Sequence, residues 1–188
     1  MKNKTKWILI VFILSFILSI IFSGISTAMA ESFNTIILAI TIIVVIGIGI
    51  LFDMIGVAVL TCKESNLHAK AAMKMKGAKA AIALIKNSTK VSSVCNDVIG
   101  DICGIVSGSL GAALTLDIVG AINISSVIVT MIVTATISAL TVGFKAIFKD
   151  VAEKNSDTIV YTVGKIISIF KKEKKNNTWL VEFLCYNT

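Results

Sequence analysis

Long runs of apolar residues dominate the chain and predict helices that cross a membrane. Crossing the hydrocarbon takes about 20 residues at about 1.5 Å each. Although β-branched residues are frequent in these runs, their length fits helices far better than strands. The pattern predicts an all-α integral membrane protein, with four transmembrane helices at residues 7–30, 32–62, 91–116 and 118–144.

The first apolar run, within residues 1–30, has two interpretations. Lysines precede it, and Ala28-Met29-Ala30 stands before Glu31, a pattern typical of a secretory signal peptide with its cleavage site. The run is longer than the usual apolar core of such signals, about 7–15 residues. We therefore expect a retained first span, with the cleaved signal, and hence three transmembrane helices, as the alternative.

The remaining segments predict helices outside the spans. We expect residues 31–145 to form the transmembrane core, with a helical hairpin at 63–90 that breaks near Gly77, because glycine disfavours a helix interior. Residues 146–175 alternate apolar and charged positions, which predicts an interfacial amphipathic helix next to the membrane. Ser156 is a candidate cap for a second helix near Asp157. Residues 176–188 are a tail.

The charge pattern sets an expected orientation. The net charge is +7, and all 18 basic residues are lysines. Lysines precede the first span, fill the hairpin and follow the fourth span, whereas the other two connections have none. The positive-inside rule then predicts a multi-pass protein of the cytoplasmic membrane, with both termini and the hairpin cytoplasmic. The lysines would contact anionic headgroups of the lipid bilayer, and the absence of arginine argues against nucleic acid as a partner.

The four cysteines form no C-x-x-C pair, and this topology places none of them in an outer loop. We therefore interpret them as reduced, small apolar residues and expect neither a disulfide nor a zinc framework. The cysteines are Cys62, Cys95, Cys103 and Cys185.

Three aspartates interrupt the apolar runs and are the main functional clue. An aspartate facing lipid near mid-membrane costs about 2.5–3.5 kcal/mol, so Asp53, Asp97 and Asp101 should face protein, water or a cation. Counted from the expected helix ends, Asp53 and Asp101 reach similar depths, about 14 and 15 Å. Together with the Asn96 amide and carbonyls near Gly100, these carboxylates would suit a hard cation such as Mg²⁺.

The same helix also has a structural interpretation. Gly100, Gly104 and Gly108 recur every four residues, a spacing that lets membrane helices approach closely. The aspartates would then hydrogen-bond to serines such as Ser92 and Ser93, or pair with Lys145.

Several motifs give the chain a resemblance to the transmembrane domain of the CNNM/CorC (CorB) family of magnesium transporters. The resemblance covers about residues 40–170. The family has an F-S-G-S-E-T-A-type end of its first span, a cytoplasmic K-x-G-x-x-A-x-x-x-L-x-x-N stretch, and a later span that begins near I-G-N-x-x-x-N. The similar segments here are Phe52-Asp53-Met54-Ile55-Gly56-Val57-Ala58, Lys76-Gly77-Ala78 through Leu84-Ile85-Lys86-Asn87, and Val94-Cys95-Asn96-Asp97-Val98-Ile99-Gly100-Asp101.

The resemblance implies a site for dehydrated Mg²⁺ built from serine, asparagine and glutamate. By position, Asp53 stands for the serine, Asn96 for the first asparagine, and Gly100, with Asp101 beside it, for the second. Lys145 stands where the glutamate is expected, so it would be an internal counter-charge. We expect no counterpart of the family's CBS domains, because the residues after 175 are too few for such a domain. The candidate metal residues are Asp53, Asn96, Asp97, Gly100 and Asp101.

The sequence leaves several functions open. We expect a small membrane protein that binds or moves divalent cations such as Mg²⁺. The sequence leaves undecided whether it forms a homodimer. The alternative is a degenerate relative that transports nothing and acts as a structural or regulatory membrane partner. An aspartyl intramembrane protease is disfavoured because its Y-D and G-x-G-D motifs are absent, so no enzyme is expected. A holin-like pore former is favoured only by size and the basic tail.

Overall fold

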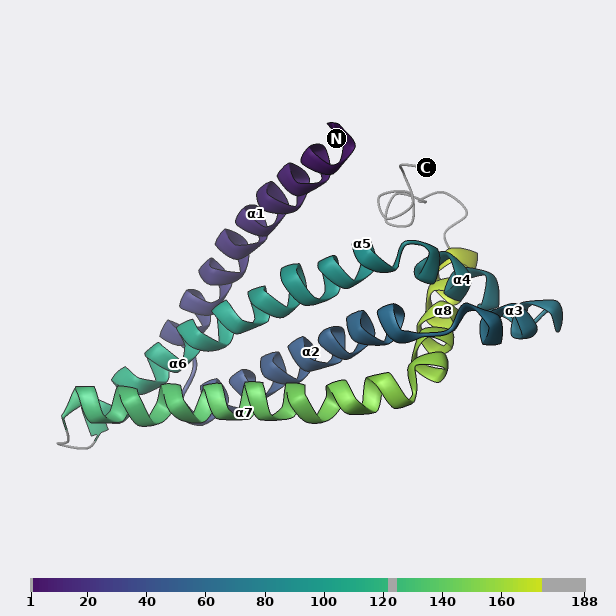
Figure 1. Cartoon of the computed structure of the whole chain (residues 1–188). Helices are drawn as coiled ribbons and strands as arrows, with labels where there is room; N and C mark the ends of the chain where they lie inside the picture. Colours follow the sequence, from purple (N-terminus) through teal and green to yellow (C-terminus); the bar gives the residue numbers. More distant parts are fainter. Residues whose placement is uncertain (1, 122–124, 174–188) are drawn as a thin grey trace. The chain divides into compact units, whose positions relative to one another are not determined.

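In the computed structural model, all regular elements of the described residues, 2–121 and 125–173, are helical (Figure 1). The tail at residues 176–188, with Cys185, lies outside the described residues. The helices are α1 (Lys2–Ser32), α2 (Thr35–Thr61), α3 (Glu64–Ala72), α4 (Ala78–Lys86), α5 (Ser88–Ser93), the π-helix η1 (Val94–Gly100), α6 (Asp101–Ala121), α7 (Ser126–Lys154) and α8 (Ser156–Glu173).

Among the residues that the structure describes, four helical stretches are long and apolar enough to cross a membrane, as the apolar runs of the sequence predict. They are Ile8–Ala30, Thr35–Thr61, Ser88–Ala121 and Ser126–Lys154. The third stretch joins α5, η1 and α6. The last three contain 27, 34 and 29 residues, which exceeds the roughly 20 that cross the hydrocarbon. Each therefore has additional turns that can lie outside the apolar layer.

The boundary expected at Asp117 is wrong. Helix α6 continues through Asp117 to Ala121, and α7 begins only at Ser126. The Asp117 carboxylate accepts a hydrogen bond from the Thr35 hydroxyl at 3.2 Å, so this charge does not end the helix. The Ser125 carbonyl accepts bonds from the first amides of α7. Helix α7 also passes Lys145 and ends at Lys154, before the separate helix α8 begins at Ser156.

The chain divides into two compact units, and each is built from two separate stretches. Unit 1 comprises Met1–Leu51 and Val98–Ala146, and unit 2 comprises Phe52–Asp97 and Ile147–Thr188. Helices α2 and α7 each contribute one part to each unit. This division differs from the consecutive segments expected from the sequence.

Unit 1 contains α1, most of α2, α6 and most of α7. Helix α1 packs against α6, where the hydroxyls of Ser26 and Ser109 lie 2.7 Å apart. A Cβ atom at Gly49 of α2 would come within 2.9 Å of the Cys103 Cβ atom of α6, so these two helices also approach closely. Small and hydroxyl residues at such positions are typical of helix packing in membranes, where burial alone gives little driving force.

Unit 2 has a conventional apolar core. Its centre is formed by fully buried side chains such as Leu67 of α3, Val59 near the end of α2 and Val160 of α8. Helices α3 and α4 form the expected hairpin. Its turn contains Gly77 at a φ of 91°, a left-handed conformation that glycine adopts without strain.

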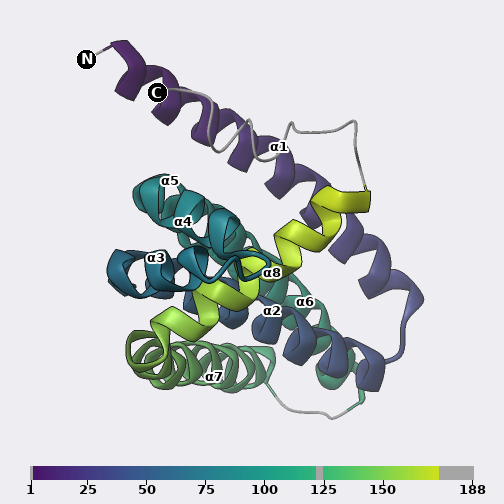
Figure 2. The ribbon, with the colours of Figure 1, turned by 90° about the vertical axis from the view of Figure 1, so that its right-hand side faces the viewer.

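Helix α8 crosses α4 at very short range (Figure 2). A Cβ atom at Gly164 would lie 2.7 Å from the Ala81 nitrogen and 2.8 Å from the Gly77 carbonyl oxygen, and one at Gly77 would meet the backbone of Lys165. Only glycine permits this approach. One apolar face of α8 therefore packs on the core of unit 2, and the expected place of this helix at the membrane interface stays a prediction.

Candidate functional site

The two units divide the predicted metal residues between them. Asp53, Asn96 and Asp97 belong to unit 2, whereas Gly100, Asp101 and Lys145 belong to unit 1. The ion site as expected from the sequence therefore stays a prediction. The site can be built from its unit 2 part alone.

Asn96 lies directly on the backbone of α2. A Cβ atom at Gly56 would overlap the Asn96 side-chain oxygen, Oδ1, so only glycine leaves room for the amide at this place. Asp53 stands three residues before Gly56 on α2, one turn away on the same side of the helix, and it is half-buried. The structure thus brings the amide of Asn96 to the stretch of α2 that carries Asp53.

The Asn96 amide is only partly satisfied. Its nitrogen donates to the Ser92 hydroxyl at 3.3 Å, a long hydrogen bond. Its oxygen is buried and accepts no hydrogen bond from the described residues. A buried polar atom left without a partner costs about 1–3 kcal/mol, so such an atom requires an explanation, and a bound water or ion is a common one. An amide oxygen is a suitable ligand for Mg²⁺.

A π-helical segment orients this amide. The π-helix η1 spans Val94–Gly100 and joins α5 to α6. Single π-turns are rare and occur frequently at functional sites, because the wider turn changes which side chains face a neighbour. Within η1, Cys95 is buried and Asn96 is half-buried, whereas Asp97 is exposed. No pattern in the sequence predicts this π-helical segment.

The other two carboxylates behave differently from Asp53. Asp97 and Asp101 are both exposed, and because they belong to different units their expected common face stays a prediction. The chain itself therefore does not enclose these two side chains. In the part of the chain that the structure describes, no group of three or more His, Cys, Asp or Glu side chains could hold a metal ion. A metal here would need one or two protein carboxylates, neutral oxygens and water, which is how Mg²⁺ is usually bound.

The charged groups of the predicted internal pair are both engaged. Neither Asp53 nor Lys145 is without a partner in the structure. Because they belong to different units, the Asp53–Lys145 pair stays a prediction.

A second polar cluster of unit 2 joins α2, α3 and α8. The Cys62 thiol donates to the Asp157 carboxylate at 3.1 Å, and the Asn66 amide donates to the other oxygen of the same carboxylate. Hydrogen bonds from Asn66 and then Cys62 hold the pKa of Asp157 below its usual value. Burial, followed by the Asp157 hydrogen bond and charge, raises the pKa of Cys62 to about 12. The thiol stays protonated at neutral pH and is an unreactive donor.

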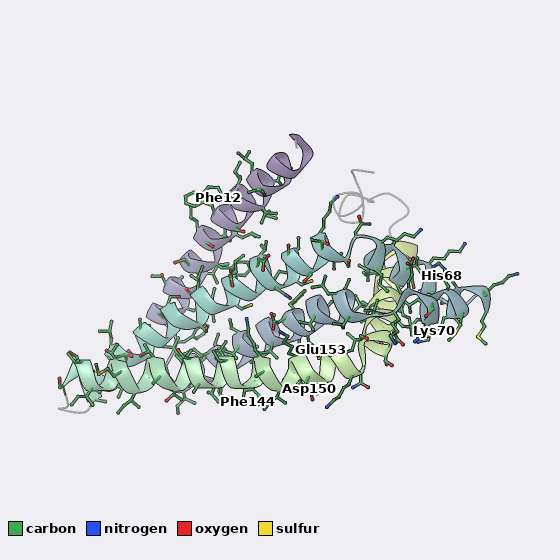
Figure 3. The ribbon with its side chains drawn as sticks, viewed as in Figure 1. Phe12, His68, Lys70, Phe144, Asp150 and Glu153 are labelled. Atoms are coloured by element: carbon green, nitrogen blue, oxygen red, sulfur yellow. The ribbon has the colours of Figure 1, made fainter. Side chains whose placement is uncertain are left out.

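The same surface includes one cation–π contact. The Lys70 ammonium of α3, labelled in Figure 3, lies 4.6 Å from the centre of the Tyr161 ring of α8. Such contacts contribute about 0.5–1 kcal/mol at exposed sites. This cluster could not be predicted from the sequence, because Cys62 and Asp157 are far apart in the chain and carry no motif. Its residues bond to one another, so the cluster holds α3 and α8 together next to the end of α2.

No protein-family model, no curated protein and no solved structure matches the chain. The comparisons therefore assign the chain to no family. The resemblance to the magnesium transporters depends only on the quoted motifs.

Proposed function

We propose that the chain is a small multi-pass membrane protein that binds a divalent cation such as Mg²⁺, with Asp53 and Asn96 as its first ligands. One observation carries the proposal: the buried Asn96 oxygen receives no hydrogen bond from the residues that the structure describes, and it lies against Gly56, one turn from Asp53. A cation would satisfy that oxygen, and one nearby carboxylate would supply negative charge.

The lengths of the helices support a place at the edge of the hydrocarbon. The charge-free parts of α2 and α7, residues 35–52 and 126–144, each match the roughly 20 residues that cross it. The apolar layer would then end near Asp53 and Lys145. The free-energy cost of a carboxylate is lower at this level than at mid-membrane, and a hydrated cation can reach it from the aqueous side. The site would open to the lysine-rich side, which the positive-inside rule makes cytoplasmic.

The ligand test uses the purified full chain in lipid nanodiscs and follows thermal unfolding. Mg²⁺ at about ten times its Kd should stabilise the protein by about 1.4 kcal/mol, or about 3–5 °C in Tm. Asp53→Asn and Asn96→Ala should remove most of this shift. Asp150→Asn is the matched control, since Asp150 is an acidic residue of the same unit that is exposed and pairs with Lys154.

The alternative function, a non-transporting structural or regulatory partner in the membrane, is favoured by a different observation. Lys145 stands where the resemblance implies an acidic ligand, and both Asp53 and Lys145 already have partners. On this alternative, Mg²⁺ produces no shift in the wild type, while Asp53→Asn still lowers its Tm. The same unfolding series therefore separates the two functions.

We also propose that the chain forms a homodimer, an oligomeric state that the sequence leaves undecided. On α6, no atom of the described residues lies within 4 Å of a Cβ position at the exposed Gly104 or Gly108, which leaves this helix face room for a close approach. The exposed Asp101 lies on the same side, one turn earlier. Gly108→Leu should convert a dimer to a monomer in light scattering. A wild-type monomer in nanodiscs would end the dimer proposal and leave the Asp53–Asn96 site untouched.

A further inference from the structure

Helix α8 has two faces with different environments. Its inner face packs on the unit 2 core through the buried Val160 and Gly164. Its outer face consists of positions that helical spacing places in one stripe and that are all exposed. These outer residues are Thr158, Thr162, Lys165, Ile166 and Ile169.

The outer face changes character along the helix. Its first half presents two threonines, whereas its second half presents Ile166 and Ile169, which are 48% and 58% exposed, next to Lys165. The sequence then continues with Lys171, Lys172, Lys174 and Lys175. Exposed apolar residues beside clustered lysines are typical of helices that lie at an anionic membrane surface.

The position of α8 in the chain brings the membrane within reach. Helix α7 is a candidate membrane span and ends at Lys154. Helix α8 begins only two residues later, at Ser156. Figures 1 and 2 both show α8 running across the direction of the last turns of α7 (Ile147 onward). Spanning helices are tilted by about 20° from the membrane normal on average, so a helix that crosses α7 lies close to the membrane plane.

We propose that the second half of the outer face of α8, Lys165, Ile166 and Ile169, binds anionic phospholipids of the leaflet at which α7 ends. The isoleucines enter the boundary between headgroups and acyl chains, and the lysines pair with lipid phosphates. Two isoleucines give too little apolar area for a stable protein partner, which needs about 800 Å² on each side. A lipid surface needs no such area, because α7 already holds the helix beside it. This inference is independent of the proposed cation site.

The test replaces Ile169 with the photo-crosslinking residue p-benzoylphenylalanine in the full chain. The protein is placed in nanodiscs of mixed phosphatidylcholine and phosphatidylglycerol, illuminated, and analysed by mass spectrometry for lipid adducts. The matched control carries the same residue at Met73, which is 75% exposed in the α3–α4 turn next to Lys74. Both positions are exposed, so neither replacement disturbs the core.

The proposal predicts lipid adducts at position 169, with phosphatidylglycerol enriched over its share of the bilayer, and few adducts at position 73. Lys165→Gln should lower that enrichment by up to about fivefold, the equivalent of about 1 kcal/mol for each lysine near a charged surface. Equal yields at positions 169 and 73, adducts without lipid preference, or adducts to a second protein chain would each overturn it.

Discussion

The two units differ in where their apolar side chains lie: unit 2 buries them in a core, whereas α1 of unit 1 exposes them. In unit 2, a buried apolar cluster centred on residues such as Leu67 and Val160 resembles the core of a water-soluble domain. In unit 1, α1 exposes most of its apolar side chains, and Phe12, which is 70% exposed, points away from the helix (Figure 3). The hydrophobic effect can drive the first arrangement, but lipid tails are as apolar as the side chains of the second. Matched substitutions should therefore have unequal costs in the two units.

The largest difference should follow from truncating one large apolar residue in each unit. Leu67→Ala in α3 leaves a cavity in the unit 2 core and should lower the free energy of unfolding by about 3 kcal/mol. Phe12→Ala should change it by less than about 0.5 kcal/mol, because Phe12 is exposed in the fold and an exposed apolar side chain on a membrane span would have the same lipid surroundings after unfolding. Hydrogen exchange of α3, α4 and α8 amides in nanodiscs measures the first effect. Equal losses of protection in the two variants would contradict the comparison.

A smaller difference is expected when a methyl group is added to a glycine in each unit. Gly164→Ala forces α8 away from the backbone of α4 and should cost about 2 kcal/mol. Gly143→Ala in α7 meets open space and should be neutral or slightly stabilising, since alanine favours a helix. The hydrogen-exchange rates of the α8 amides distinguish the two variants. If Gly164→Ala leaves α8 as protected as the wild type, the close crossing of α4 and α8 is not required.

A third effect concerns the polar cluster of unit 2 and its dependence on pH. Because the pKa of Asp157 is lowered on folding, the carboxylate stabilises unit 2 above about pH 4, and this contribution is lost as pH falls through the folded pKa. Asp157→Asn should cost about 1 kcal/mol at pH 7 and reduce the acid sensitivity of α8 exchange. Asp150→Asn, at an exposed surface ion pair, serves as the control and should do neither. An unchanged acid profile in Asp157→Asn would assign the sensitivity to other groups.

The smallest effect is chemical and should leave stability at neutral pH unchanged. With its pKa raised to about 12, the Cys62 thiol should react with iodoacetamide at pH 8 far more slowly than an unfolded cysteine. Stability should fall as pH rises above about 9, because only the unfolded thiol ionises there. Mass spectrometry of peptides from alkylated protein measures the rate. Rapid labelling of Cys62 in the folded chain would mean that the cluster opens easily.

Most of the helical architecture could be predicted from the sequence, because it depends on local pattern. Long apolar runs gave the four candidate spans, Gly77 marked the turn of the hairpin, and Ser156 marked the start of α8. The boundary at Asp117 was missed because a single charge is a weak signal. Its hydrogen bond with Thr35 depends on a neighbouring helix that no local pattern reveals.

The candidate site was less predictable for the same reason. The sequence selected Asp53 and Asn96 as polar residues in apolar runs, yet it gave no role to Gly56, which makes room for the Asn96 amide. The π-helix that separates the half-buried Asn96 from the exposed Asp97 has no sequence signature. Both features arise where two helices meet, so they become visible only in three dimensions.

The most direct measurement of the central claim is a high-resolution density map of the full chain in nanodiscs with Mg²⁺, compared with a map obtained in the presence of a chelator. Our account predicts a density peak about 2.1 Å from the Asn96 Oδ1 atom, with octahedral neighbours that include an Asp53 oxygen, present only with Mg²⁺. A protein N–H or O–H donor about 2.9 Å from that oxygen in both maps would contradict it, since the oxygen would then have a hydrogen-bond partner and no place for a metal.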